Sequence, residues 1–131
     1  HGNIRLAKTS GPDAQTTTHF YPIEGAELDL ERDVCDAGYP LRPHVVWFGE
    51  AVPAYVQAIE WVQDADIFIV IGSSLGVYPV AGLVHEIPAS CQAFYIDPKA
   101  NQQHLPAQYE CIAATATQGL AQLKPRLLAA L

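Results

Sequence analysis

The stretch 66–74 constrains the fold of this chain more than any other part of the sequence. Its apolar centre, Ile67–Ile71, is an unbroken run of β-branched and aromatic residues, and Gly72-Ser73-Ser74 follows directly. Unbroken apolar runs are typical of parallel strands that helices cover on both faces. Pro79, shortly afterwards, suits the first position of a helix. The stretch therefore predicts a buried strand, a turn of small residues and a helix.

A strand, a turn and a helix in this order also predict a place for a ligand. In open α/β sheets, ligands bind in the crevice outside the carboxyl ends of the strands. Small side chains let a ligand approach the backbone, and a helix N-terminus offers N–H groups to an anion. The same pattern also occurs in tight turns that bind nothing, so the stretch alone leaves both interpretations open.

Composition excludes several classes of protein. The chain has 131 residues, 50% of them hydrophobic and 16% charged, which suits one globular domain with a core. Its net charge of −7 and seven scattered basic residues argue against nucleic-acid binding, which needs clustered Lys and Arg. No apolar run approaches the roughly 20 residues that cross a bilayer, so no membrane partner is expected.

The cysteines and the first residue bear on the setting of the protein. Cys35, Cys91 and Cys111 are far apart, which is no disulfide framework and favours a reducing, cytoplasmic location. The two later cysteines lie in apolar runs and are predicted to be buried. The chain begins with His1 and contains no Met, which is expected of a fragment or a processed product.

Two regions differ in pattern, and they predict two parts. Residues 1–40 are rich in Thr, Gly, Pro and acidic residues and are predicted to be irregular, with little core. Residues 41–131 alternate predicted strands and helices, which is typical of a parallel sheet with right-handed crossovers. The predicted strands are 43–48, 67–71, 93–96 and 109–113, and the predicted helices are 53–63, one from 79, and about 117–131. The last helix is expected to bury Leu120, Leu123, Leu127 and Leu128, and Pro125 to kink it.

The fold class that this order predicts is α/β, as half of a doubly wound, Rossmann-like parallel sheet with helices on both faces. No G-x-G-x-x-G sequence, the mark of a complete dinucleotide-binding fold, occurs in the chain. The strand next to the missing half is expected to have an open edge, and open edges pair with other chains. The expected partner is therefore the missing N-terminal half or another chain.

Three motifs resemble those of one family. The segment Leu41–Glu50, LRPHVVWFGE, resembles the substrate-side signature of the sirtuins, the NAD-dependent protein deacylases. The segment Ile71–Gly82, IGSSLGVYPVAG, is similar to the sirtuin nucleotide loop, and His1-Gly2 resembles the His-Gly that carries the catalytic base. The motifs follow the order of the family, and the resemblance, which is strongest to short bacterial members, covers nearly the whole chain.

The resemblance implies a role for each matching residue. His1 would be the general base that takes a proton from a ribose hydroxyl of NAD, a task suited to an imidazole near neutral pH. An acyl-lysine peptide would lie as an added strand against Val46, Trp47, Phe48, Gly49 and Glu50, with Gly76 and Val77 opposite. NAD would contact Gly72, Ser73, Ser74, Asp97 and Ala116. The implied reaction moves the acyl group of lysine to ADP-ribose and releases nicotinamide.

Two departures from the family qualify these expectations. Most sirtuins hold a structural Zn²⁺ with two cysteine pairs, but only Cys35 lies in that region, and Thr9 falls where a cysteine is expected. No metal is therefore expected. The Gly-Ala-Gly pyrophosphate loop and the Gln-Asn-x-Asp nicotinamide pocket are absent from these residues, so the isolated chain is expected to have little activity.

Three functions remain open at this point. The first is an NAD-dependent protein lysine deacylase, the second a sirtuin-like mono-ADP-ribosyltransferase, and the third a non-catalytic half-Rossmann module that needs a partner chain. His1 favours the first, because deacylation needs a base after nicotinamide has left.

Overall fold

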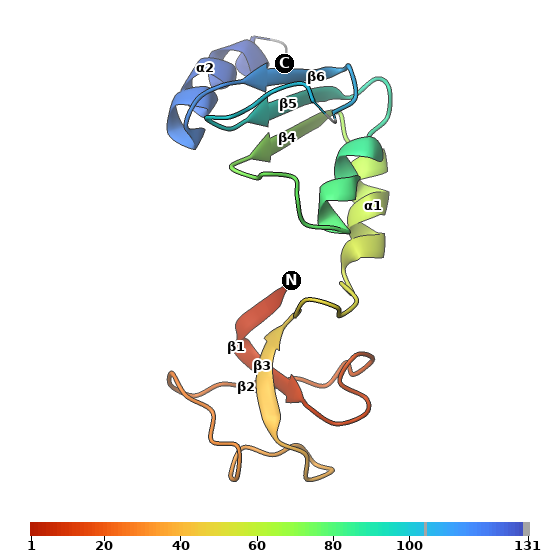
Figure 1. Ribbon diagram of the computed structural model, residues 1–131, viewed down its shortest axis with the longest axis vertical. Coiled ribbons are helices and arrows are strands. Elements are labelled where there is room, and N and C mark those ends of the chain that lie inside the picture. The colour runs from red at the N-terminus through yellow and green to blue at the C-terminus, as the bar shows by residue number, and fades with distance from the viewer. Residues whose placement is uncertain (104, 130–131) are drawn as a thin grey trace. The chain divides into compact units, whose positions relative to one another are not determined.

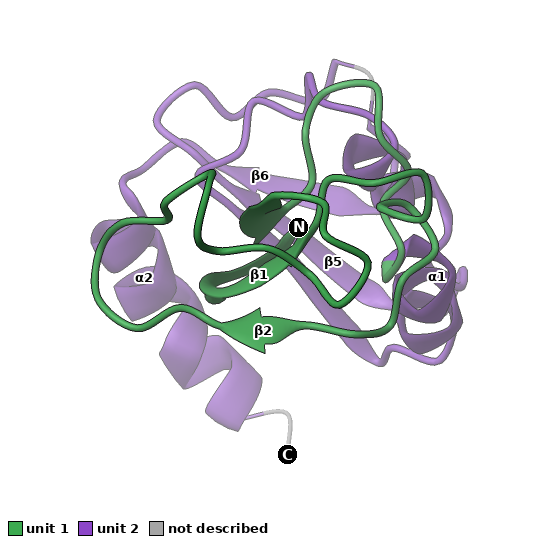
Figure 2. Ribbon diagram, turned by 90° about the horizontal axis from the view of Figure 1, so that it is seen from below, with its two compact units in different colours: residues 1–54 green, residues 55–131 purple. Residues whose placement is uncertain are grey.

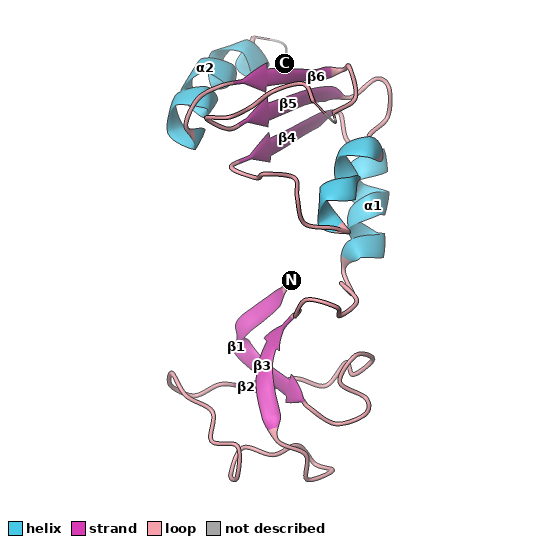
Figure 3. Cartoon of the chain, in the orientation of Figure 1, coloured by secondary structure: helices cyan, strands magenta, loops and turns pink. Residues whose placement is uncertain are grey.

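The computed structural model describes residues 1–103 and 105–129. Its contacts divide the chain into two compact units, His1–Ala54 and Tyr55–Leu131, which Figure 2 distinguishes by colour. The predicted boundary between residues 40 and 41 therefore differs from this division. The α-helices and strands are labelled in Figure 1, and Figure 3 colours the chain by secondary structure.

The first unit is an antiparallel sheet with long loops. Its strands are β1 (Gly2–Thr9), β2 (Tyr21–Pro22) and β3 (Leu41–Val45), in the spatial order β2-β1-β3. Ala7, Cys35 and Leu41 are buried together and form a small core. The expectation that residues 1–40 are irregular with little core is therefore wrong for β1, which is eight residues long.

The strand predicted at 43–48 also differs from the structure. The observed strand, β3, begins at Leu41 and ends at Val45, and it pairs with β1 rather than joining the parallel sheet. The apolar run alone could not reveal this, because the residues that pair it with β1 include the charged Lys8 and Arg42, which face each other in the register. The predicted four-stranded parallel sheet therefore has three strands.

The second unit is the expected α/β fragment. The parallel strands β4 (Ile67–Ile71), β5 (Gln92–Ile96) and β6 (Tyr109–Ile112) lie in the order β4-β5-β6. Two α-helices, α1 (Tyr55–Gln63) and α2 (Ala116–Leu128), and the 3₁₀ helix η1 (Val80–His85) complete it. Thr115 caps α2 by accepting the Gln118 N–H at 3.4 Å.

Helices cover both faces of this sheet. On one face, Val84 of η1 packs with Ala93, Tyr95 and Tyr109, and on the other Leu123 of α2 packs with strand residues. The members of this second cluster are Phe94, Ile96, Ile112 and Leu123. Gly119 lets α2 approach the sheet closely, because a Cβ there would lie 2.3 Å from Cγ2 of the fully buried Ile96.

Three burial predictions in this unit are wrong. The strand Ile67–Ile71 was predicted to be buried, but it lies at the edge of the sheet. Its two end residues, Ile67 and Ile71, are therefore 39% and 40% exposed. Leu120 and Leu128 are exposed on α2, and Cys111 is only half-buried. The last two residues of the helix predicted at 117–131 lie outside the described residues.

Candidate functional site

In the first unit, pairing of β1 with β3 places His1 beside the predicted peptide rim. Gly2 lies opposite Val45 in the register, and one residue further the N–H of Val46 donates to the His1 carbonyl at 2.9 Å. The predicted base and the first predicted rim residue are therefore neighbours on adjacent strands.

Gly2 is the residue that permits this pairing. Its φ is +101°, and a Cβ at this position would lie 2.0 Å from the carbonyl oxygen of His44. A side chain would therefore both strain the backbone and collide with β3. The glycine of the His-Gly pair thus allows β1 to approach β3 where His1 is held.

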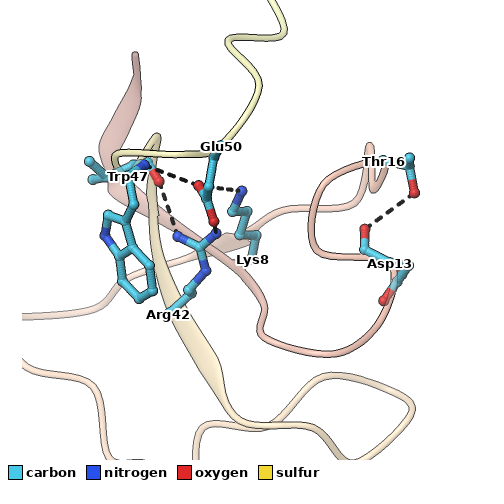
Figure 4. A network of polar contacts seen from close by, with 7 residues as sticks. Lys8, Asp13, Thr16, Arg42, Trp47 and Glu50 are labelled. Atoms are coloured by element: carbon cyan, nitrogen blue, oxygen red, sulfur yellow. Dashed lines mark hydrogen bonds and ion pairs between the residues drawn. The ribbon is translucent and has the colours of Figure 1, made fainter.

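The predicted rim contains a turn that two hydrogen bonds between Glu50 and Trp47 close, one from the backbone of Glu50 and one to its side chain (Figure 4). The Glu50 N–H donates to the Trp47 carbonyl at 3.0 Å, and Glu50 Oε2 accepts the Trp47 N–H at 3.0 Å. The hydrogen bond from Trp47 is the main reason that the pKa of Glu50 lies below its ordinary value. Within this turn Phe48 is 93% exposed, so its ring is open to contact from another group.

Two buried cations converge on the same carboxylate. Arg42 Nη2 pairs with Glu50 Oε1, and Lys8 Nζ lies 3.8 Å from Glu50 Oε2. Arg42 Nη1 also donates to the Val45 carbonyl at 3.1 Å, and its guanidinium lies 4.0 Å from the centre of the Trp47 ring. Both cationic side chains are more than nine-tenths buried. One carboxylate therefore ties β1, β3 and the rim turn together.

The pH dependence of stability follows from this carboxylate. Because the folded state lowers the pKa of Glu50, the charged network stabilises the fold above the unfolded-state pKa of about 4.3 and is lost as pH falls through the folded-state value. We expect the stability difference between wild type and Glu50→Gln to be constant from pH 7 to about 5 and to shrink below pH 4. Urea denaturation of the full-length protein across this range measures it. A difference that grows in acid contradicts the assignment.

In the second unit, the predicted nucleotide residues follow the carboxyl ends of the three parallel strands, which lie side by side. Ile71, Ile96 and Ile112 are aligned in the register. The residues that follow them are Gly72, Ser73 and Ser74 after β4, Asp97 after β5, and Ala113 to Ala116 after β6, of which Ala116 begins α2. A nucleotide-binding edge of this kind combines small residues, an acidic residue and a helix N-terminus.

Asp97 also has a local structural role. Its Oδ1 accepts the N–H of Lys99 at 2.8 Å, which forms the turn before the polar connection to β6. The turn occupies one carboxylate oxygen, and the predicted contact with a ribose would use the other.

Gly76 and Val77 belong to the second unit, whereas the residues predicted to lie opposite them, Val46–Glu50, belong to the first. Val77 is 54% exposed, and its carbonyl accepts the Ala81 N–H at the start of η1. The backbone of these two residues is thus joined directly to the 3₁₀ helix.

The residues present do not fit the structural zinc site, made of two cysteine pairs, that most sirtuins have. The hydroxyl of Thr9 donates to Cys35 Sγ at 3.4 Å, which is the main reason that the pKa of Cys35 is lowered. Among residues 1–103 and 105–129, no group of three or more His, Cys, Asp and Glu could hold a metal ion. Packing of Cys35 with Ala7 and Leu41 holds this part of the unit instead.

Sequence reasoning missed Lys8, Arg42 and Tyr95. Arg42 lies within the quoted LRPHVVWFGE motif, which could have drawn attention to it. Lys8 and Tyr95 carried no comparable signal, because one is a lone cation in a mixed strand and the other resembles an ordinary core residue.

In the described part of the chain, no helix has the length and apolar character needed to cross a membrane.

Comparison with known sequences gives one family and several relatives. The sequence model of the Sir2 family matches residues 1–79. An NAD-dependent protein deacylase from Bacteroides thetaiotaomicron is 43% identical over 131 residues, which cover 99% of this chain and 56% of the relative. Another from Helicobacter pylori is 46% identical over 88 residues, covering 67% of this chain and 38% of the relative.

Solved structures of similar fold give the same picture. A crystal structure of a Sir2 homologue in complex with NAD has a TM-score of 0.72 and 28% identity, over 99% of this chain and 50% of that one. A mutant Sir2 homologue in complex with 2′-O-acetyl-ADP-ribose has a TM-score of 0.71 and 26% identity, over 100% and 52%. The chain thus spans about half the length of the relatives that it matches.

Proposed function

Because this chain belongs to the Sir2 family, we propose that its full-length protein removes acyl groups from protein lysines in an NAD-dependent reaction. The relatives from Bacteroides thetaiotaomicron and Helicobacter pylori, which carry the name NAD-dependent protein deacylase, support this proposal. Residues 1–131 supply the peptide rim, the base and one flank of the nucleotide site. The rest of the protein, or another chain, supplies the other flank.

One observation carries the proposal, and it is the position of His1. The backbone of this residue is hydrogen-bonded to Val46 at the rim where an acyl-lysine peptide would add as a strand. A base for the acyl-transfer step must lie beside the acyl group, and the pairing of β1 with β3 keeps His1 beside the rim.

The remaining residues have roles that bind and orient. The rim residues Val46, Trp47, Phe48, Gly49 and Glu50, with Gly76 and Val77, would hold the peptide. Gly72, Ser73, Ser74, Asp97 and Ala116 would hold the adenosine side of NAD at the strand ends. When bound, NAD supplies the ribose carbon that the acyl oxygen joins as nicotinamide leaves. His1 would then take the proton of the ribose hydroxyl that receives the acyl group.

The setting of the protein is part of the proposal. Each of the three cysteines carries a free thiol, which is usual in the reducing cytoplasm, and the relatives named above are bacterial. These two observations support our proposal that the protein acts in the bacterial cytoplasm.

The test uses full-length protein, NAD and an acetyl-lysine peptide, with the products weighed by mass spectrometry. We expect deacetylated peptide, nicotinamide and O-acetyl-ADP-ribose. Transfer of ADP-ribose to protein, without loss of the acetyl group, would assign the chain to the mono-ADP-ribosyltransferases instead. No consumption of NAD by a protein that carries both halves would favour a non-catalytic module.

A further inference from the structure

We propose that Tyr95 is a positioning residue for nucleotide binding, which it supports by fixing the backbone of the loop Gly72–Leu75 through the Ser73 carbonyl. This inference rests on the proposed NAD site. Tyr95 contacts the loop from the core of the sheet, and it is not one of the residues predicted to contact the nucleotide.

The contact is direct and comes from the buried centre of the sheet. The Tyr95 hydroxyl donates to the Ser73 carbonyl at 2.8 Å, and the Tyr95 side chain belongs to the core cluster of β5. In the same strand the Ile96 carbonyl accepts the Gly72 N–H at 3.0 Å. Two successive residues of β5 therefore hold two successive residues of the loop.

The loop needs such support because its backbone is strained. Leu75 has a φ of +54°, which is uncommon for a residue with a branched side chain and is kept only where the surroundings over-determine it. The Ser73 hydroxyl accepts the Leu75 N–H at 3.2 Å, and the Leu75 side chain packs against the cluster that contains Tyr95. The hydroxyl of Tyr95 thus fixes the peptide from which this turn begins.

The Tyr95 hydroxyl keeps its proton, so it can always donate this hydrogen bond. Burial, assisted by the nearby Asp97 carboxylate, raises the pKa of Tyr95 above its ordinary value, so the proton remains in place at physiological pH. Tyr95 also lines a cavity of about 280 Å³ together with Ser74 and Leu75. Loss of the hydroxyl would therefore leave room for the loop to move.

Tyr95→Phe in the full-length protein tests this role, and Tyr109→Phe is a matched control. The Tyr109 hydroxyl is also buried and also donates to a backbone carbonyl, that of Val84 at 3.0 Å, but it holds η1 rather than the loop. The probe is ADP-ribose, titrated by calorimetry, because its binding needs no chemical step. We expect Tyr95→Phe to raise Kd about five- to ten-fold, the loss of one hydrogen bond, and Tyr109→Phe to raise it less than two-fold.

A second measurement keeps the inference testable if the variant is less stable. Amide exchange of residues 72–75 without ligand is expected to be faster in Tyr95→Phe than in Tyr109→Phe. In assays, KM for NAD should rise and kcat at saturating NAD should stay within two-fold. Equal effects of the two variants on Kd and exchange would overturn the role of Tyr95 and leave the proposed function intact. Failure of the wild-type protein to bind ADP-ribose would overturn both.

Discussion

Replacing His1 with alanine in the full-length protein is expected to lower kcat/KM for deacylation by about 10²–10⁴-fold, the usual contribution of a positioned base. The reason is that the variant keeps the rim, whose Val46 N–H donates to the main chain of residue 1, but loses the imidazole. ADP-ribose binding should change less than two-fold. Steady-state kinetics and calorimetry measure the two effects.

His19→Ala is the matched control for this prediction. His19 is an exposed residue in the loop before β2 of the same unit, and its ring packs against Tyr21 of β2 rather than at the rim. Its replacement should leave kcat/KM within about two-fold of wild type. Retention of more than a tenth of the activity by His1→Ala, or equal losses in both variants, would show that another group is the base.

Replacing Glu50 with glutamine is expected to cost about 3 kcal/mol of stability, at the low end for a buried ion pair that loses one partner. The variant keeps the shape of the side chain but leaves Lys8 and Arg42, both more than nine-tenths buried, without their shared anion. Because the same carboxylate accepts the Trp47 N–H, KM for the acyl-lysine peptide should also rise. Urea denaturation and peptide kinetics measure these two effects.

Glu110→Gln provides the comparison for Glu50→Gln. It breaks the ion pair of Glu110 with Arg126, in which both side chains are about half exposed, at 47% and 53%. Exposed pairs contribute about 1 kcal/mol or less, so the midpoint of denaturation should shift little. If the two variants lose equal stability, the charged network beneath the rim does not have the structural role assigned to it.

The sequence could predict the second unit because its signals are local. The predicted strands 67–71, 93–96 and 109–113 are short and bounded by turn residues, and they correspond to the parallel strands β4, β5 and β6. The prediction that Leu120 and Leu128 are buried was wrong, because both are exposed. Helical spacing shows which apolar residues share a face of the helix, but it does not show how much of that face a three-stranded sheet can cover.

The first unit was less predictable because non-local pairing forms it. β1 pairs with β3 across more than thirty intervening residues, and buried charged side chains hold the pair, so neither apolar run nor alternation revealed it. Motif resemblance named the rim and His1 but not Lys8, the cation on the neighbouring strand. Tyr95 was missed because its packing resembles that of a core residue, and only the structure gives the direction of its hydroxyl.

We expect a nucleotide to bind where the three parallel strands β4, β5 and β6 end side by side. Hydrogen–deuterium exchange of the full-length protein, with and without ADP-ribose, tests it most directly. We predict slower exchange on binding in three separate segments, 72–75, 97–99 and 114–118, and no change in the loop 24–36 of the first unit. Binding of ADP-ribose with unchanged exchange in all three segments would show that the nucleotide does not bind at these strand ends.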